Sequence, residues 1–223
     1  MNIAENIHRF RSELPEGVKL IAITKTKPNE DILEAYDAGY KMFGENKVQE
    51  LVSKYAALPK DIEWHMVGHL QSNKVKYIAP FVHLIHGVDR SKLFQVIDKE
   101  GRKNNRVIDI LMQFHIAGEE TKFGFDLKEA KELLDSETFK NYEFIKVKGV
   151  MGMATFTEDM EQVRAEFQEL VNIFNELKKQ YFTSDPDFKE ISMGMSNDYP
   201  IALEEGSTMV RIGSLIFGKR NYH

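Results

Sequence analysis

Apolar and polar residues along the chain follow two different spacings, which alternate from one block to the next. In the first block, apolar residues recur every three or four positions, which predicts an amphipathic helix. These apolar residues are Ile3, Ile7, Phe10 and Leu14. The second block, "VKLIAIT" at residues 18–24, is short, apolar and rich in β-branched residues, and therefore predicts a buried strand.

Seven more strand-like blocks follow, and helix-like blocks separate them. The predicted strands lie within residues 18–24, 41–46, 63–68, 82–88, 106–116, 144–153, 188–194 and 208–218. The predicted intervening helices lie within residues 29–40, 47–58, 71–81, 91–104, 126–136, 160–181 and 199–206. Asn29 is a candidate N-cap for the first of these helices, and Gly39 lies where that helix should end.

Strict alternation of strands and helices indicates parallel βαβ units. Eight such units in 223 residues predict an α/β fold: one closed (β/α)8 barrel of the TIM type, with an extra N-terminal helix and residues 1–223 forming a single domain. A doubly wound open sheet is the alternative fold. It is less favoured because the dinucleotide-binding pattern G-x-G-x-x-G is missing.

Composition narrows the functional classes. The net charge of −5 provides no basic field for binding nucleic acid, and the absence of cysteine excludes disulfides, thiolate catalysis and cysteine-ligated zinc. No apolar run has the length of a membrane span, and the N-terminus lacks the apolar region of a secretory signal. We therefore expect a soluble cytoplasmic protein with no membrane or nucleic-acid partner.

The active site of such a barrel lies at the carboxyl ends of its strands, and two lysines follow the first strand. Ile21, Ile23 and Lys25 share one face of that strand, because side chains alternate along it. If this face looks into the barrel, Lys25 reaches the mouth of the site. Apolar surroundings there favour a neutral amine, which can condense with an aldehyde. The alternative is that Lys25 and Lys27 are two solvated loop lysines.

Other strand ends carry weaker signals. Asn46 follows the second strand and could either line the site or cap the next helix. His65 and His69 lie four residues apart with no evident third ligand, so structural roles are favoured over a metal site. Met151 and Met153, at the end of the sixth strand, are expected to pack in the core.

The loops after strands seven and eight form the recurrent phosphate site of this barrel, and here both have suitable residues. Ser196 follows strand seven, and the Gly213–Ser214 step follows strand eight. The step exposes backbone N–H groups and supplies a hydroxyl. Arg211 shares the face of Gly213 and should point at the ligand. The alternative is that each serine caps a helix and Arg211 forms an internal ion pair. This alternative accounts for the residues after strand seven or after strand eight taken alone, but explains less well why both loops suit a phosphate.

A lysine, a phosphate site and an arginine at one barrel end together suggest pyridoxal 5′-phosphate (PLP). In this hypothesis a lysine at the end of the first strand holds the aldehyde, and Arg211 faces the pyridine nitrogen. An arginine at that position disfavours protonation of the ring nitrogen, which weakens the ring as an electron sink.

A series of ordered blocks also resembles a known family. They are "AITKTKP", "FGENKVQE", "WHMVGHLQSNK", "IHGVD", "EETKFGF", "KGVMGMA" and "ISMGMSNDYPIALEEGSTMVRIGSLIFG". In these blocks the chain is similar to the pyridoxal phosphate homeostasis protein family, whose fold-type III barrel is related to the N-terminal barrel of alanine racemase. The resemblance covers nearly the whole chain.

The resemblance implies roles for individual residues. Lys25 would hold PLP as an aldimine, with Arg211 at the ring nitrogen and Asn46 beside the cofactor. The residues implied in phosphate binding are Ser196, Gly213 and Ser214. Lys27 and Lys122 match family lysines that do not hold the resting cofactor, and a role in PLP transfer or at a secondary site is expected for them.

The resemblance further implies a PLP carrier that buffers the cofactor and delivers it to PLP-dependent apoenzymes. Racemisation needs an acid/base group on each face of the substrate carbon. In alanine racemase one of these is a tyrosine from a second domain, for which this barrel leaves no residues. We therefore expect no robust catalysis, and a monomer. The alternatives are a fold-type III PLP enzyme, such as an amino-acid racemase or decarboxylase, and a barrel for another phosphorylated metabolite.

Overall fold

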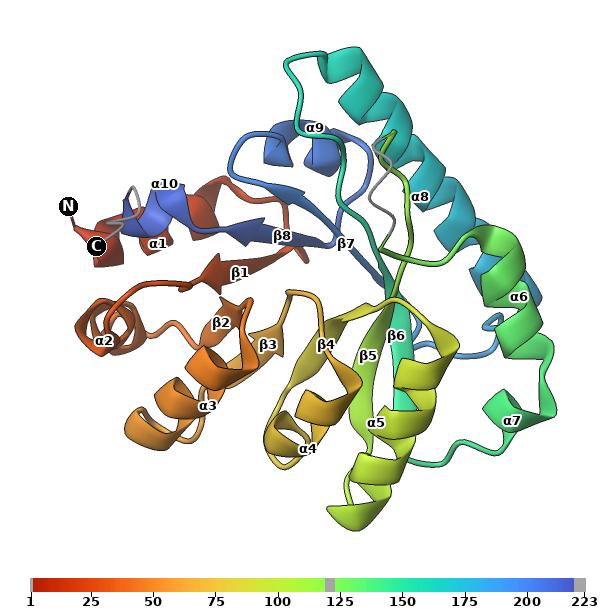
Figure 1. The fold of residues 1–223 in the computed structure, drawn as a ribbon. Helices are drawn as coiled ribbons and strands as arrows, with labels where there is room; N and C mark the ends of the chain where they lie inside the picture. Colours follow the sequence, from red (N-terminus) through yellow and green to blue (C-terminus); the bar gives the residue numbers. More distant parts are fainter. Residues whose placement is uncertain (1, 119–122, 219–223) are drawn as a thin grey trace.

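Eight parallel strands close into a barrel in sequence order, as predicted (Figure 1). The structure is a computed structural model that describes residues 2–118 and 123–218. The strands are β1 (Lys19–Ile23), β2 (Met42–Glu45), β3 (Glu63–Met66), β4 (Leu84–Val88), β5 (Ile108–Gln113), β6 (Ile145–Met151), β7 (Glu190–Met195) and β8 (Met209–Ile212). Pairing of β1 with β8 closes the barrel, with Ile21 opposite Arg211.

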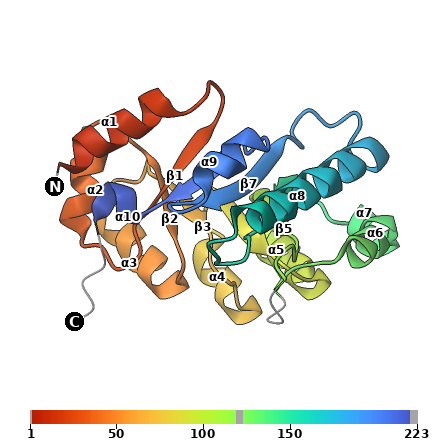
Figure 2. The same ribbon diagram turned by 90° about the horizontal axis from the view of Figure 1, so that it is seen from above.

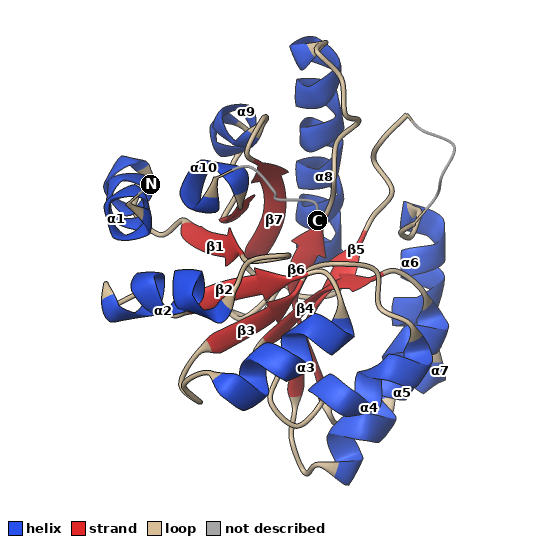
Figure 3. Ribbon diagram, turned by 60° about the vertical axis from the view of Figure 1, so that its left-hand side comes forward, coloured by secondary structure: helices blue, strands red, loops and turns tan. Residues whose placement is uncertain are grey.

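Helices form a layer outside the strands (Figures 2 and 3). They are α1 (Ile3–Glu13), α2 (Asn29–Asp37), α3 (Val48–Ala57), the 3-10 helix η1 (Ser72–Lys74), α4 (Val75–Ile78), α5 (Ser91–Lys103), α6 (Leu127–Asp135), α7 (Glu137–Lys140), α8 (Met160–Gln180), α9 (Tyr199–Glu204) and α10 (Ser214–Phe217). In the part of the chain that the structure describes, none of these helices has the length and apolar character needed to cross a bilayer.

The main core lies between the strands and the helices. Its largest side chains, among them Trp64, Phe43, Phe94 and Phe167, are fully buried, and each contributes about 1.5–3 kcal/mol or more by leaving water. Inside the barrel a smaller apolar layer is formed by Leu84, Leu111, Met151 and Met209. The rest of the barrel interior includes polar side chains that lead toward the carboxyl ends of the strands.

The extra N-terminal helix is attached to the first and last units of the barrel (Figure 2). Ile7 and Phe10 of α1 are buried, and the side-chain amide of Asn6 donates to the carbonyl oxygen of Ile216 in α10 at 3.0 Å. The backbone N–H of Ile3 donates to Glu34 Oε1 of α2 at 2.8 Å. Helix α1 therefore stabilises the place where the barrel closes.

Three local details differ from the sequence predictions. Asn29 is not an N-cap: Pro28 occupies that position, and Asn29 is the first residue of α2. The third predicted helix is only the 3-10 helix η1 followed by the short helix α4, which ends at Ile78, two residues before Pro80. Helix α7 was not predicted. Its N-cap is Ser136, whose side chain accepts from the N–H of Phe139. Gly39 does end α2, with φ of +84°.

Candidate functional site

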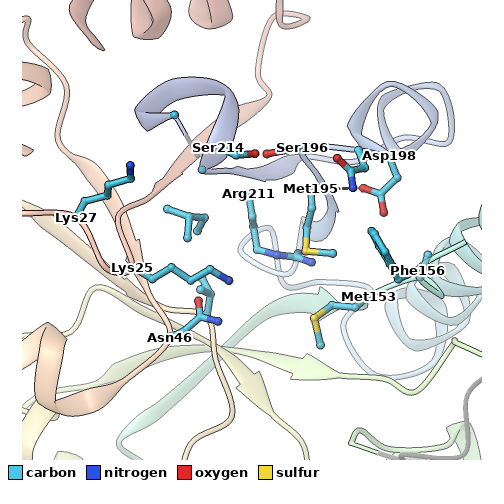
Figure 4. Close-up of a pocket in the computed structure, with 16 residues that line it drawn as sticks. Lys25, Lys27, Asn46, Met153, Phe156, Met195, Ser196, Asp198, Arg211 and Ser214 are labelled. Atoms are coloured by element: carbon cyan, nitrogen blue, oxygen red, sulfur yellow. Dashed lines mark hydrogen bonds between the residues drawn. The ribbon is translucent and has the colours of Figure 1, made fainter. Parts of the chain in front are cut away.

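A pocket of about 400 Å³ opens at the carboxyl ends of the strands (Figure 4). Its lining comes from β1, β7 and β8 and from the segments that follow β1, β2, β3, β6, β7 and β8. The structure brings all six residues that the sequence proposed to this one pocket: Lys25, Asn46, Ser196, Arg211, Gly213 and Ser214. Lys27 also lines it, whereas Lys122 lies outside the described residues.

Lys25 lies two residues beyond β1 and is half-buried. Its side chain extends into the pocket beside Arg211, and Lys27 extends toward α10, where its Nζ donates to the carbonyl oxygen of Phe217 at 2.6 Å (Figure 4). Between the two lysines, Thr26 has φ of +64°, which is uncommon for a β-branched residue. This turn gives the two lysines different surroundings.

A buried ion cluster holds the backbone just before Lys25. Lys54 Nζ donates to the carbonyl oxygen of Thr24 at 2.7 Å, to Glu45 Oε1 at 2.6 Å and to Glu50 Oε1 at 2.7 Å. Burial raises the pKa of the Glu45 carboxyl, and Lys54 acts in the opposite direction. Because Thr24 directly follows β1 and Glu45 is the last residue of β2, the cluster links two of the strand ends that form the pocket.

Arg211 is the buried cation of the site, with 5% of its surface exposed. Its guanidinium donates to Ser192 Oγ at 2.8 Å and to the carbonyl oxygen of Gly152 at 3.1 Å. Burial lowers its pKa to about 10, while Asp198 acts to raise it, so it is still a cation at neutral pH. No carboxylate among the described residues lies within 4.0 Å of the guanidinium, so the internal ion pair that the sequence left open does not form there.

A column of neutral polar side chains continues from Arg211 through the barrel. Ser192 Oγ lies 2.8 Å from His86 Nδ1, and His86 Nε2 lies 2.9 Å from His65 Nδ1. Burial lowers the pKa of both imidazoles well below the ordinary value, so both are uncharged. His65 is thus buried in this column, with its Nδ1 at His86. His69 is elsewhere, with its Nδ1 3.0 Å from Asp89 Oδ2.

The two predicted phosphate-binding segments lie on the same side of the pocket, at the top of Figure 4. Neither serine is a helix N-cap: Asp198 has that position before α9, and Gly213 has it before α10. The Ser196 turn is held by Asp198, whose carboxylate accepts from the N–H of Met195 at 2.5 Å. The hydroxyls of Ser196 and Ser214 therefore lie at the pocket without a capping role.

Three apolar residues at the rim were not found from the sequence as site residues. Met153, expected in the core, is 41% exposed; Phe156 is 83% exposed; and Met195 is also exposed. All three line the pocket. The sequence pattern around a methionine at a strand end is the same whether its side chain is exposed or buried, so only the three-dimensional structure shows that these methionines line the pocket. Asn46 also lines the pocket and does not cap α3, whose N-cap is Lys47.

The donors of this pocket suit a small phosphorylated aldehyde. An amine and a buried guanidinium meet two hydroxyls and the backbone of Gly213 around one cavity.

In sequence comparisons, the family described as "Alanine racemase, N-terminal domain" matches residues 1–221. The pyridoxal phosphate homeostasis protein of Aquifex aeolicus is 45% identical, and the match covers 100% of both chains.

The chain belongs to the pyridoxal phosphate homeostasis protein family.

Solved structures agree with this membership. PipY of Synechococcus elongatus with PLP bound is 34% identical, with a TM-score of 0.86 over 97% of this chain and 100% of PipY. Alanine racemase from Bartonella henselae shares the fold at a TM-score of 0.71, with 14% identity, over 98% of this chain and 59% of the racemase chain. The pyridoxal phosphate homeostasis protein family thus uses the same barrel as the racemase.

Replacing Lys54, the cation of the buried cluster beside β1 and β2, should destabilise the fold in a pH-dependent way. Lys54→Met leaves the Glu45 carboxylate buried without its cation, which should cost about 3–5 kcal/mol of unfolding free energy near pH 8. Without Lys54, burial raises the pKa of Glu45 further, so the folded variant keeps a proton that the unfolded chain releases above the ordinary value of 4.5. The unfolding free energy should therefore fall as the pH rises from about 5 to about 8.

Denaturant unfolding of the Lys54→Met variant at both pH values checks this. The matched control is Lys41→Met, which breaks the pair of Lys41 with Asp61, two side chains that are about half exposed. That control should lose much less stability than Lys54→Met, because exposed ion pairs contribute little. Equal stability of the two variants near pH 8 would contradict the role given to Lys54.

Proposed function

We propose that this chain is a single-domain PLP carrier, residues 1–223, which buffers PLP and delivers it to PLP-dependent apoenzymes. The observation that carries the proposal is the meeting of Lys25, Arg211 and the two serine-bearing segments at one pocket of about 400 Å³. When bound, PLP supplies an aldehyde that forms a reversible covalent bond with a primary amine. PipY, 34% identical over 97% of this chain, has been solved with PLP bound, which supports the proposal.

The proposed roles follow from the donors present. Lys25 would hold the aldehyde end. Across the pocket, the hydroxyls of Ser196 and Ser214 and the backbone at Gly213 would bind the phosphate, because a phosphate dianion accepts several hydrogen bonds. The two remaining residues are Arg211, which would donate to the ring nitrogen, and Asn46, which would contact the cofactor from the β2 side. An arginine donor keeps that nitrogen unprotonated.

The pocket lining supports a carrier rather than a catalyst. Racemisation requires a second acid/base group facing the substrate carbon from the other side. Among the described lining residues the ionisable side chains are Lys25, Lys27, Asp198 and Arg211, and none of the lining residues described is a tyrosine or histidine. Arg211 at the ring nitrogen would also weaken the cofactor as an electron sink.

The open rim supports delivery to a partner. Phe156 and Met153 present exposed apolar surface beside the pocket, and such surface is where a recipient apoenzyme would make contact. We propose that the carrier acts as a monomer in the cytoplasm.

Reductive trapping tests the covalent assignment. We expect borohydride treatment of the PLP-loaded protein to fix the cofactor on the peptide that contains Lys25, as seen by mass spectrometry. The trapped adduct and the visible absorption band should both be lost in Lys25→Ala. The matched control, Lys27→Ala, should keep both, since Lys27 extends toward α10. An adduct on any other side chain, or none, would refute the proposed function.

A second experiment tests the phosphate site. Ser196→Ala should weaken PLP binding by about ten- to a hundredfold, because a hydrogen bond to a charged group contributes about 1.5–3 kcal/mol. Binding of pyridoxal, which has no phosphate, should stay within about twofold of the parent. Ser12→Ala, an exposed position on α1, is the control. Equal losses for PLP and pyridoxal in Ser196→Ala would show that Ser196 does not bind the phosphate.

Amino-acid turnover separates the carrier from a fold-type III enzyme. We expect the PLP-loaded protein, incubated with L-alanine and other L-amino acids, to form neither D-enantiomers nor carbon dioxide at enzymatic rates. Chiral chromatography and carbon dioxide release measure the two products. Turnover at about 1–10³ s⁻¹, the ordinary range for enzymes, would show that the protein is a racemase or decarboxylase and would refute the carrier function.

A further inference from the structure

A second group of ligand-type side chains lies at the opposite, amino-terminal end of the barrel. Glu63 is the first residue of β3, His65 follows on the same face of that strand, and His83 directly precedes β4. One potential metal-binding atom from each residue lies within 4.8 Å of the other two, and His83 Nε2 is 3.7 Å from Glu63 Oε2. The N–H of His83 donates to the carbonyl oxygen of Trp64 at 2.8 Å, which fixes its backbone beside β3.

His65 gives the strongest sign that something binds here. Its side chain is 1% exposed, and its Nε2 atom has no hydrogen-bond partner among the described residues. The other ring nitrogen, Nδ1, is already engaged by His86, so Nε2 is the nitrogen left for the cluster. Leaving a buried polar atom unsatisfied is costly, and native folds rarely do so.

We propose that Glu63, His65 and His83 bind a divalent transition-metal cation such as Zn²⁺. Two imidazoles and one carboxylate are an established donor set for zinc, and imidazole favours transition metals over Mg²⁺ and Ca²⁺. The side chains of Glu63 and His83 are 44% and 48% exposed, so the cation can enter from solvent and keep water in its remaining coordination positions.

The buried partners of His65 suit a metal ligand. A ligating histidine usually donates its second ring N–H to another acceptor, which orients the ring. Here His65 Nδ1–H would donate to His86 Nε2, and His86 Nδ1–H would donate to Ser192 Oγ. Ser192 Oγ can accept this bond together with the one from Arg211, because a hydroxyl oxygen has two lone pairs. This tautomer leaves the lone pair of His65 Nε2 directed at the cluster.

Charges near the cluster do not oppose a cation. Lys19 interacts electrostatically with His65, but its ammonium is paired with Glu190 at 2.5 Å. Asp109 interacts with His83 and adds a second carboxylate to this end of the barrel, although Lys148 lies 3.8 Å from it. Metal–nitrogen bonds of about 2.1 Å require ligand atoms about 3.4 Å apart, so the exposed side chains of Glu63 and His83 have to move inward.

Calorimetric titration of the full chain with Zn²⁺, after dialysis against EDTA, tests the proposal. We expect one equivalent to bind, and Mg²⁺ not to compete. Glu63→Gln and His83→Asn should each weaken Zn²⁺ binding at least tenfold; both side chains are exposed, so both variants should fold. The matched control, His8→Asn, alters an exposed histidine of α1 and should bind Zn²⁺ like the parent.

Co²⁺ provides an independent readout at the same site. We expect visible d–d absorption typical of four- or five-coordinate Co²⁺, displaced by Zn²⁺ and absent in His83→Asn. The same titrations in Lys25→Ala should be unchanged, because that variant leaves this end of the barrel intact and removes the proposed covalent link to PLP. The metal-binding result therefore does not depend on whether Lys25 binds PLP.

Two results would overturn the metal site. One is no binding of Zn²⁺ or Co²⁺ by the parent chain. The other is equal Zn²⁺ affinity in the parent, Glu63→Gln and His83→Asn, which would place the bound metal elsewhere on the surface.

Discussion

The pairing of β1 with β8 is the constraint on which the rest of this structure depends. In a closed parallel barrel the carboxyl ends of all strands meet at one mouth. The register of the closing pair sets Ile21 opposite Arg211, so the segment that follows β1 lies beside the end of β8. Lys25 and Arg211, which are 186 residues apart, line one pocket for this reason. Helix α1 reinforces the same closure, through its contacts to α2 and α10.

Burying Arg211 in the barrel has consequences for the residues beneath it. A guanidinium that leaves water must be hydrogen-bonded, and here its partners are a serine hydroxyl and a backbone carbonyl rather than a carboxylate. The charge is therefore not neutralised by a close ion pair, and it remains directed toward the pocket. The serine is itself held by His86, and His86 contacts His65. A continuous line of polar contacts thus runs from the cofactor pocket to the amino-terminal end of the barrel.

Membership in the pyridoxal phosphate homeostasis protein family is consistent with how the pocket is built. The same barrel occurs in alanine racemase, where the matching region is 59% of that chain. A carrier needs an amine, a phosphate site and access for a recipient. A racemase needs in addition a second proton-transfer group above the cofactor. In the carrier that we propose, the exposed apolar rim formed by Met153, Phe156 and Met195 would give a recipient access to the pocket.

The sequence by itself determined the order of strands and helices, because apolar spacing and β-branched composition depend on local chemistry. It also placed Lys25, Ser196 and the Gly213–Ser214 step at strand ends, since a parallel barrel assigns every βα loop to one mouth. Resemblance to the family added the roles that we propose for them. Local signals were ambiguous at Asn29, which begins a helix instead of capping it, and at Met153, which is exposed instead of packed.

Only the tertiary structure decided which polar side chains face one another inside the barrel. His65, His86 and Ser192 come from three strands, and their contact depends on barrel register and on which face of each strand turns inward. The grouping of Glu63 and His65 with His83 likewise depends on how β3 pairs with β4. No spacing along one chain encodes these distances, because they arise from strands packed side by side around a closed barrel.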